Sequence, residues 1–409
     1  MQIYLVGGAV RDELLGLPIQ ERDWVVVGAS PAEMIKQGFL PVGKSFPVFL
    51  HPQTKEEYAL ARTEKKVAGG YHGFTFDTAA NVTLEEDLQR RDITINAMAK
   101  TTEGKIIDPY GGQRDLENKV LRHVSNAFLE DPVRVLRIAR FAARFAHLGF
   151  TVASETMTLM QTMVHNGELD FLIAERVWKE TERALKEKHP EVFIQVLRQC
   201  GALKVLFPEI DALYGVPQNV KYHPEVDTGV HMEMVLAQAT LLTPDADVRF
   251  AAMLHDLGKG QTPPAQWPEH DAHEMRSAAL VKELCSRLRV PNDFAGLAYA
   301  VAKYHGECHR VSSKTPPKAI LELLEKCDAF RKPERFAKIL LACEADCRGR
   351  PGYAQKNYVP AQILATAFAA AKNADLNTKS MSDLKGLEIK QKIFELRVKA
   401  IEGSLLQLR

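Results

Sequence analysis

The spacing of apolar residues divides the chain into a short strand-rich start and a long helical remainder. Four apolar runs of strand length alternate with turn residues near the N-terminus; they cover residues 3–6, 24–27, 47–50 and 57–61. Runs of this length are typical of buried strands. Residues 62–82 are rich in Gly, Lys and Thr and predict a flexible loop. From about residue 115 onward the apolar spacing is helical, so the sequence predicts an α+β fold: a small N-terminal mixed sheet with helices, then an all-helical part.

Local sequence signals mark the starts of two predicted helices. Thr83 followed by Glu86 forms a capping-box pattern that predicts a helix start. The sequence 130–132, Glu-Asp-Pro, opens another helix, because proline is favoured in the first turn. Arginines recur along this second helix at spacings of three and four, at positions Arg134, Arg137, Arg140 and Arg144. They form one stripe with few balancing acids, which predicts an anionic ligand; a solvated charged face is the alternative.

Composition limits the classes of protein that the chain can represent. It has 409 residues, 46% hydrophobic, 26% charged, with a formal net charge of +1. These values predict a globular protein of two or more domains whose nucleic-acid contacts, if any, come from a local basic patch. Six cysteines without a Cys-x-x-Cys pair suit a reducing cytoplasm. The chain has no run of 18 apolar residues and no signal-peptide pattern, so we expect a cytoplasmic protein that does not span a membrane.

The first strand is followed by two glycines and then by a pair of carboxylates. Gly7 and Gly8 leave no Cβ in the way of a phosphate near the start of a helix. Glu21 and Asp23 lie two apart just before the second strand, so in extended chain they point to the same face. Such a pair suits a hard divalent metal. Glu57 would be a third carboxylate, although a solvated strand residue is the favoured interpretation.

This order of strand, Gly-Gly, helix, carboxylate pair and strand resembles the nucleotidyltransferase superfamily that includes DNA polymerase β. The form Gly-Gly-Ala-Val-Arg-Asp at residues 7–12 is similar to its branch of tRNA CCA-adding enzymes and poly(A) polymerases. Arg90-Arg91-Asp92 resembles that branch's RRDxTxNA motif, and residues 130–137 resemble its Glu-Asp-x-x-Arg-x-x-Arg pattern. One departure is Glu21, where the family mostly has Asp.

The resemblance implies template-independent addition of CCA to the 3′ end of tRNA, with CTP and ATP as substrates. It assigns catalysis and Mg²⁺ binding to Glu21 and Asp23. The residues that it assigns to the nucleotide are Gly8, Arg11, Arg91, Asp131, Arg134, Arg137 and Arg140. Of these, Asp131 and Arg134 would read the base: cytosine and adenine both present an amine donor beside a ring-nitrogen acceptor, which a carboxylate and a guanidinium complement.

A second motif lies downstream, where an apolar helix ends in His255-Asp256 followed by Leu-Gly-Lys-Gly. It resembles the HD phosphohydrolase superfamily, with His231 as the first histidine. The resemblance implies a metal such as Ni²⁺ on His231, His255 and Asp256, and phosphatase, 2′-nucleotidase and 2′,3′-cyclic phosphodiesterase activities. Further candidate ligands are His270, His273, His305 and His309. The superfamily's last ligand is an Asp, and none follows His305 closely, so a domain that retains the fold without turnover stays an open alternative.

The chain therefore divides into four predicted parts: a nucleotidyltransferase head at 1–135, a helical neck with the base-reading helix at 136–227, an HD domain at 228–330, and a helical tail at 331–409. The tail's basic residues, Lys385, Lys390, Lys392, Arg397 and Lys399, predict binding of tRNA by shape and phosphate contacts. We expect a monomer or a homodimer. Two alternatives stay open: a poly(A) polymerase, which shares every motif above, and an HD phosphohydrolase whose head only binds RNA.

Overall fold

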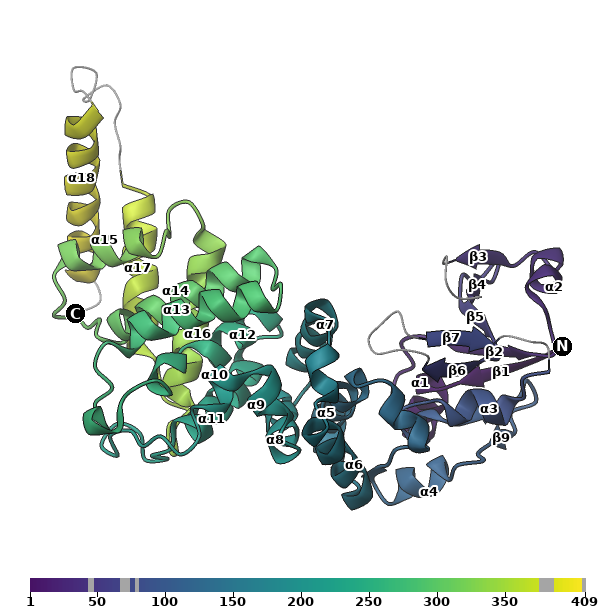
Figure 1. Ribbon diagram of the computed structural model, residues 1–409. Coiled ribbons are helices and arrows are strands. Elements are labelled where there is room, and N and C mark those ends of the chain that lie inside the picture. The colour runs from purple at the N-terminus through teal and green to yellow at the C-terminus, as the bar shows by residue number, and fades with distance from the viewer. Residues whose placement is uncertain (43–47, 67–73, 78–80, 375–385, 407–409) are drawn as a thin grey trace. The chain divides into compact units, whose positions relative to one another are not determined.

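The computed structural model describes residues 1–42, 48–66, 74–77, 81–374 and 386–406. The chain forms two compact units, Met1–Leu206 and Phe207–Arg409 (Figure 1). The first unit carries the sheet and the second is built from helices, as the apolar pattern predicts. The finer division into four parts remains a prediction.

The first unit is organised around a mixed sheet. Within the described residues its strand order is β3 (Leu40–Val42), β4 (Val48–Leu50), β5 (Glu57–Leu60), β2 (Asp23–Val27), β1 (Gln2–Val6), β8 (Ala99–Lys100) and β9 (Ile106–Ile107). β2 pairs antiparallel with β1 and parallel with β5. These central strands confirm three of the four predicted runs. The fourth is confirmed from Val48 onward, and its first position lies outside the described residues.

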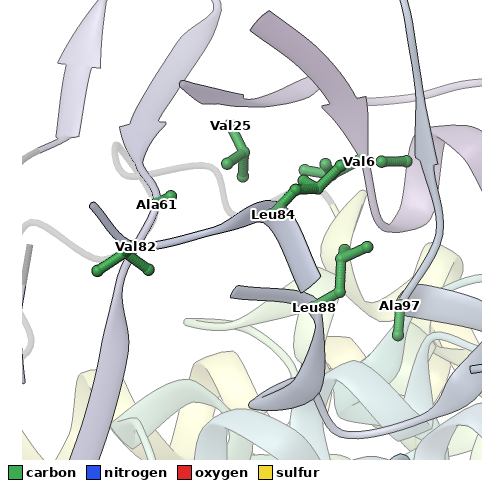
Figure 2. Close-up of a cluster of buried hydrophobic side chains, with 8 residues drawn as sticks. Val6, Val25, Ala61, Val82, Leu84, Leu88 and Ala97 are labelled. Carbon is green, nitrogen blue, oxygen red and sulfur yellow. The ribbon is translucent and has the colours of Figure 1, made fainter. Parts of the chain in front are cut away.

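Apolar side chains cover both faces of the sheet. Consecutive strand residues point to opposite faces, so each strand contributes to both layers. Figure 2 shows Val6 and Val25 packed with Leu84 and Leu88 of helix α3 (Leu84–Gln89). The next residue on β2, Val26, packs into a separate cluster with Met34 of α2 (Pro31–Lys36) and other side chains. The buried apolar layers fix the strands whose ends carry the carboxylate pair.

Helices complete the first unit. α3 begins at the predicted capping box: Thr83 accepts a hydrogen bond from the backbone of Glu86, and Glu86 accepts one from the backbone of Thr83. The other helices are α1 (Gly8–Leu14), α4 (Gly112–Glu117), α5 (Val133–Phe145), α6 (Ser154–His165), α7 (Ala174–Leu185), α8 (Pro190–Gln199) and α9 (Ala202–Leu206), and short 3₁₀ turns lie at η1 (Thr94–Asn96), η2 (Asn126–Glu130), η3 (Ala146–Leu148) and η4 (Glu168–Phe171). The arginine stripe lies on α5, whose N-cap is Pro132.

Two details of the predicted pattern are wrong. The stretch 62–82 is not loop throughout, because β6 (Thr63–Lys66) pairs antiparallel with β7 (Phe74–Asp77). Alternating Phe and Thr residues in β7 favour a strand, a local preference that the Gly-rich surroundings obscured. Strands also extend beyond the first third of the chain, since β10 (Val120–Leu121) pairs in parallel with β11 (Thr151–Val152).

The second unit contains the histidine-rich region. Its elements are α10 (Pro208–Asp211), α11 (Thr228–Leu242), α12 (Ala246–Leu254), η5 (Leu257–Lys259), η6 (Pro264–Gln266), α13 (His273–Arg287), α14 (Asn292–His309), α15 (Pro317–Lys326), α16 (Pro333–Arg348), α17 (Val359–Lys372) and α18 (Gly386–Leu406). Helices α11, α12, α14 and α16 pack against one another, which brings residues far apart in sequence to one place. Among the described residues, no helix has both the length and the apolar character needed to cross a membrane.

Candidate active site and candidate metal centre

A pocket of about 1020 Å³ lies in the first unit. It is lined by residues from α1, from the segment before β2, from the Arg90–Asp92 motif, and from α5 and α7. The residues that the resemblance assigns to catalysis or to the nucleotide all line it: Gly8, Arg11, Glu21, Asp23, Arg91, Asp131, Arg134, Arg137 and Arg140. Twelve arginines and lysines and seven carboxylates line the described pocket, an excess of positive charge that suits a polyanion.

Gly7 permits the close approach that shapes one end of this pocket. It follows β1 and is the N-cap of α1, with φ +69°, a left-handed conformation that is unfavourable for a residue with a side chain. A Cβ at this position would lie 2.8 Å from Nη1 of Arg91. Glycine here therefore allows the RRD segment to lie directly against the turn into α1.

Asp23 is the first residue of β2, and Glu21 lies two residues before it. Burial raises the pKa of Asp23; Arg91 opposes this shift, and the neighbouring Glu21 adds to it. The structure thus brings the two carboxylates close enough to repel each other, which a bound divalent cation would relieve. Glu57 faces Asp23 across the parallel β2–β5 register and is exposed, so its position also allows a third carboxylate at this edge.

The arginine stripe on α5 is balanced by acids from other elements, so the expectation of few balancing acids is wrong. Arg137 donates to Asp92, at 2.7 Å, and Arg140 donates to Glu180 of α7, at 2.6 Å. Arg144 donates to Asp12 of α1, at 3.0 Å. Spacing along one helix could not reveal these acids, because their contacts depend on tertiary packing.

A chain of polar contacts joins α1 to the RRD segment. Arg11 donates to Asp12 and, through Nη1, to Asn96 at 2.5 Å. Asn96 in turn donates to Asp92, which also accepts from Arg137. Burial alone would raise the pKa of Asp92, but Arg137 and these hydrogen bonds lower it far below its usual range. The network holds the arginines at defined positions around the pocket.

Arg91 is similarly fixed, since it shares the buried carboxylate of Asp87 with its neighbour Arg90. The two predicted base-reading residues have separate partners. Asp131 accepts two hydrogen bonds from Arg176 of α7, at 3.0 and 2.7 Å. Arg134 donates to backbone carbonyls of residues 90 and 127. Both side chains line the pocket. Asp131 is oriented by Arg176, and Arg134 is oriented by the two backbone carbonyls.

Helix α7 braces α5 through ion pairs between the two elements. Arg176 and Glu180, both on α7, each pair with a residue on or beside α5.

Four histidines converge in the second unit with the same ring orientation. The Nδ1 atoms of His231, His255, His273 and His305 lie 3.1, 2.7, 3.0 and 3.0 Å from backbone carbonyl oxygens. A carbonyl only accepts, so each Nδ1 carries a hydrogen. Metal-ligating histidines almost always donate the N–H of their outer ring nitrogen to such an oxygen, so this arrangement leaves Nε2 as the atom suited to a metal.

The Nε2 atoms face carboxylates. His231 Nε2 lies 3.0 Å from Oδ1 of Asp346, and His255 Nε2 lies 3.1 Å from Oδ2 of Asp256. The Nε2 atoms of His273 and His305 lie 3.2 and 3.4 Å from Oδ1 of Asp256. Two acceptors at such distances need a positive charge between them, a proton or a metal ion. His255 Nε2 and Asp256 Oδ1 are also buried without a hydrogen bond among the described residues, so the donor set fits a metal.

Three groups of possible ligands lie among the described residues. The converging side chains form two of them: His231, His255 and Asp346, and Asp256, His273 and His305. The third group, His223, Glu225 and His231, shares His231 with the first. Burial alone would raise the pKa of Asp256 and Asp346. Neighbouring His255 lowers both, helped by Lys259 at Asp256 and by His309 at Asp346, so both pKa values fall well below the usual range.

Asp346 supplies the carboxylate that the sequence around His305 lacks. It lies on α16, outside the predicted HD range, and packing against α11 and α12 brings it to the histidines. The available signal was an acid on the apolar face of a predicted helix, in line with Phe336, Leu340 and Cys343.

The remaining candidate histidines lie outside these two groups. His270 bonds the carbonyl of Pro217 through Nε2. His309 bonds Asp346 through Nε2, at 2.6 Å, and Tyr358 through Nδ1, at 2.9 Å.

The mixed sheet and the arginine-lined pocket are the architecture expected of a nucleotidyltransferase. Three family models match the chain: "Poly A polymerase head domain" at residues 3–122, "Probable RNA and SrmB- binding site of polymerase A" at 149–214, and "HD domain" at 228–330. Together they span most of the sequence. The chain belongs to the poly(A) polymerase family of nucleotidyltransferases and carries an HD domain.

Solved structures of CCA-adding enzymes share the fold. A CCA-adding enzyme in complex with CTP is 24% identical in sequence, with a TM-score of 0.66, and the match covers 99% of this chain and 90% of that enzyme's chain. The Thermotoga maritima enzyme complexed with tRNA is 22% identical, with a TM-score of 0.63, and covers 100% and 92%. The Bacillus stearothermophilus enzyme in complex with CTP is 23% identical, with a TM-score of 0.64, and covers 98% and 89%.

Proposed function

We propose that the protein adds CCA to the 3′ end of tRNA without a nucleic-acid template, using CTP and ATP. The observation that carries this proposal is the single pocket lined by every head residue that the sequence assigns to catalysis or nucleotide binding. The CCA-adding enzymes of the same fold, named with CTP, ATP and tRNA, support the choice of substrates.

Glu21 and Asp23 are the residues that would hold Mg²⁺, since carboxylate oxygens suit a hard cation. The metal would supply activation of the attacking 3′-OH and stabilisation of the triphosphate. The protein's own part is to position the nucleotide. Arg91 and Arg137 are each tied to one carboxylate and retain exposed guanidinium surface, so they donate to phosphate or ribose oxygens from fixed positions.

Base choice rests on Asp131 and Arg134. The carboxylate accepts from the exocyclic amine of cytosine or adenine, and the guanidinium donates to the neighbouring ring nitrogen. Guanine and uracil reverse both groups, and each buried mismatch costs about 1–3 kcal/mol. Arg176 donates to both oxygens of Asp131 and so orients the carboxylate.

Incorporation into a tRNA that ends at its discriminator base tests the proposal. Wild-type protein should add two C residues from CTP and then one A from ATP, and the variants Glu21→Gln and Asp23→Asn should add none. Glu117→Gln, an exposed position on α4, is the matched control and should retain activity. Long tails from ATP alone would identify a poly(A) polymerase, and unchanged activity of both carboxylate variants would overturn the proposal.

A second activity is supported by the two adjacent groups of histidines and aspartates in the second unit. We propose that this centre hydrolyses phosphate esters such as 2′,3′-cyclic ends, 2′-nucleotides and simple phosphomonoesters. His231, His255 and Asp346 would hold one transition-metal ion such as Ni²⁺, and Asp256, His273 and His305 a second. Metal ions there would supply an activated water for attack on phosphorus.

Hydrolysis of 2′,3′-cyclic AMP after chelation and return of Ni²⁺ tests this activity. Asp346→Asn should abolish it and spare CCA addition, whereas Asp23→Asn should do the reverse. If wild-type protein hydrolyses the phosphate ester but adds no nucleotide to tRNA, the head only binds RNA. If wild-type protein shows no hydrolysis with any divalent transition metal, the HD domain retains its fold without turnover.

tRNA is the proposed macromolecular partner, bound in part by the basic C-terminal helix. Lys390, Lys392 and Lys399 lie on α18, and Arg397 of the same helix stacks over the ring of Phe330, at 3.8 Å. Lys385 lies outside the described residues. The prediction of a monomer or homodimer stays open to sedimentation analysis.

A further inference from the structure

Glu225 has an unusual position for a residue of an irregular segment. It precedes α11 in a stretch where Tyr222 and Val226 are exposed, yet its own carboxylate is only 2% exposed. Its Oε1 lies 2.8 Å from Nδ1 of His231 and 3.0 Å from Nδ1 of His223. The segment therefore buries one charge, and it buries that charge against a histidine of the candidate metal centre.

This contact distinguishes His231 from the three other converging histidines. Their Nδ1 atoms have backbone carbonyls as hydrogen-bond acceptors, whereas Nδ1 of His231 faces both the carbonyl of Gly349 and the carboxylate of Glu225. A carboxylate on the outer nitrogen of an imidazole fixes the ring and increases the basicity of the inner nitrogen. The inner Nε2 of His231 is the atom that faces Asp346.

The backbone around Glu225 is held in place at some cost. Val226 adopts φ +62°, a left-handed conformation that is unfavourable for a β-branched residue. The conformation is maintained by a hydrogen bond from the amide of Gln218 to the carbonyl of Val226, at 2.8 Å. Asp227 then caps α11 by accepting from the amides of Gly229 and Val230. Strain that is maintained beside a buried charge indicates a functional placement.

We propose that Glu225 is a positioning residue for the HD metal centre: it orients His231 and raises the affinity of the centre for a transition metal. The inference rests on the metal centre proposed above and extends it to a residue outside the two groups proposed there as ligands. His223 supports the arrangement by donating to the same carboxylate oxygen.

A Co²⁺ titration of the full-length protein tests the proposal, read by the visible absorption of the bound ion. The His231→Ala variant identifies the absorption that belongs to the HD centre, and carboxylates of the head do not contribute to that difference. We expect Glu225→Gln, which retains size and removes charge, to weaken Co²⁺ binding about ten-fold or more and to shift the absorption.

Glu233→Gln is the matched control. Glu233 lies on α11 two residues after His231, and its carboxylate accepts from the hydroxyl of Tyr214, at 2.5 Å. This control should bind Co²⁺ as the wild type does. His223→Gln is a milder second variant that keeps the carboxylate, and it should weaken binding less than Glu225→Gln does; it serves if Glu225→Gln fails to fold.

The outcomes separate this inference from the metal centre itself. Wild-type protein without a His231-dependent Co²⁺ signal would overturn the centre and, with it, the role of Glu225. Wild-type binding with unchanged affinity and absorption in Glu225→Gln, or in His223→Gln if that is the variant that folds, would overturn the role of Glu225 alone. An equal loss in Glu233→Gln would also overturn it, because the effect would then be general to α11.

Discussion

The Arg140–Glu180 pair gives the sharpest test of how α5 is held. Both side chains are buried, 8% and 7% exposed, and Nε lies 2.6 Å from Oε2. Glu180→Gln would leave the guanidinium buried, and the carboxylate of Glu187, at 4.0 Å, would be its remaining acidic neighbour among the described residues. Removing one partner of a buried pair costs about 3–5 kcal/mol. Because Glu187 offsets part of that loss, we expect about 3 kcal/mol, a hundred-fold or greater change in the folding equilibrium of the first unit.

The control lies on the same helix. Glu182 pairs with Lys186 at 2.5 Å, but these side chains are 30% and 58% exposed. Exposed pairs four residues apart contribute about 0.3–0.5 kcal/mol, so Glu182→Gln should change stability by no more than that. The two variants make the same chemical change and differ in burial.

Urea unfolding measures both variants. The chain has three tryptophans, and a Trp267→Phe background leaves Trp24 and Trp178 to report on the first unit. With a slope of about 2–3 kcal/mol per M urea, Glu180→Gln should lower the midpoint by about 1 M or more. A shift no larger than that of Glu182→Gln would refute the reasoning. The double variant Arg140→Leu/Glu180→Leu should recover much of the loss, because it leaves no buried charge unpaired.

Three further predictions follow from the same contacts. Leu88→Ala removes a fully buried side chain beneath the sheet (Figure 2) and should cost about 2–5 kcal/mol in urea unfolding. Arg137 lowers the pKa of Asp92 in the folded state. The stabilisation that the Asp92 carboxylate provides is therefore complete above its pKa in the unfolded chain, about 4, and is lost as the pH falls below that value. The stability of Asp92→Asn should therefore vary less with pH between about 5 and 2 than that of the wild type. Asp346→Asn should lower the bound Ni²⁺ measured after dialysis, whereas Asp247→Asn, at a Lys338-paired acid, should not.

Local pattern predicted much of the fold. The apolar runs at β1, β2 and β5 and the capping box of α3 are confirmed, because strand burial and capping depend on residues close in sequence. The β6–β7 hairpin was missed, since its Gly-rich flanks dominate any local estimate.

The head residues were named from sequence because they belong to short motifs with fixed spacing. The residues that form ion pairs with them were not predicted. Glu180 neutralises Arg140 from another helix, and Arg176 holds Asp131 from the same helix as Glu180. An ion pair between elements depends on how those elements pack, and spacing along one of them does not record it.

The residues of the proposed metal centre also fall into those that the sequence predicted and those that only the structure revealed. The sequence by itself determined the class of the protein, its carboxylate pair and the histidines at 231 and 255, because glycine turns, strand alternation and helix periodicity act over a few residues. Only the tertiary structure decided which acid completes the centre and which carboxylate lies behind His231. Asp346 and Glu225 reach it from α16 and from the segment before α11. The burial of apolar helix faces brings these residues together, and that burial is a property of the whole packed unit.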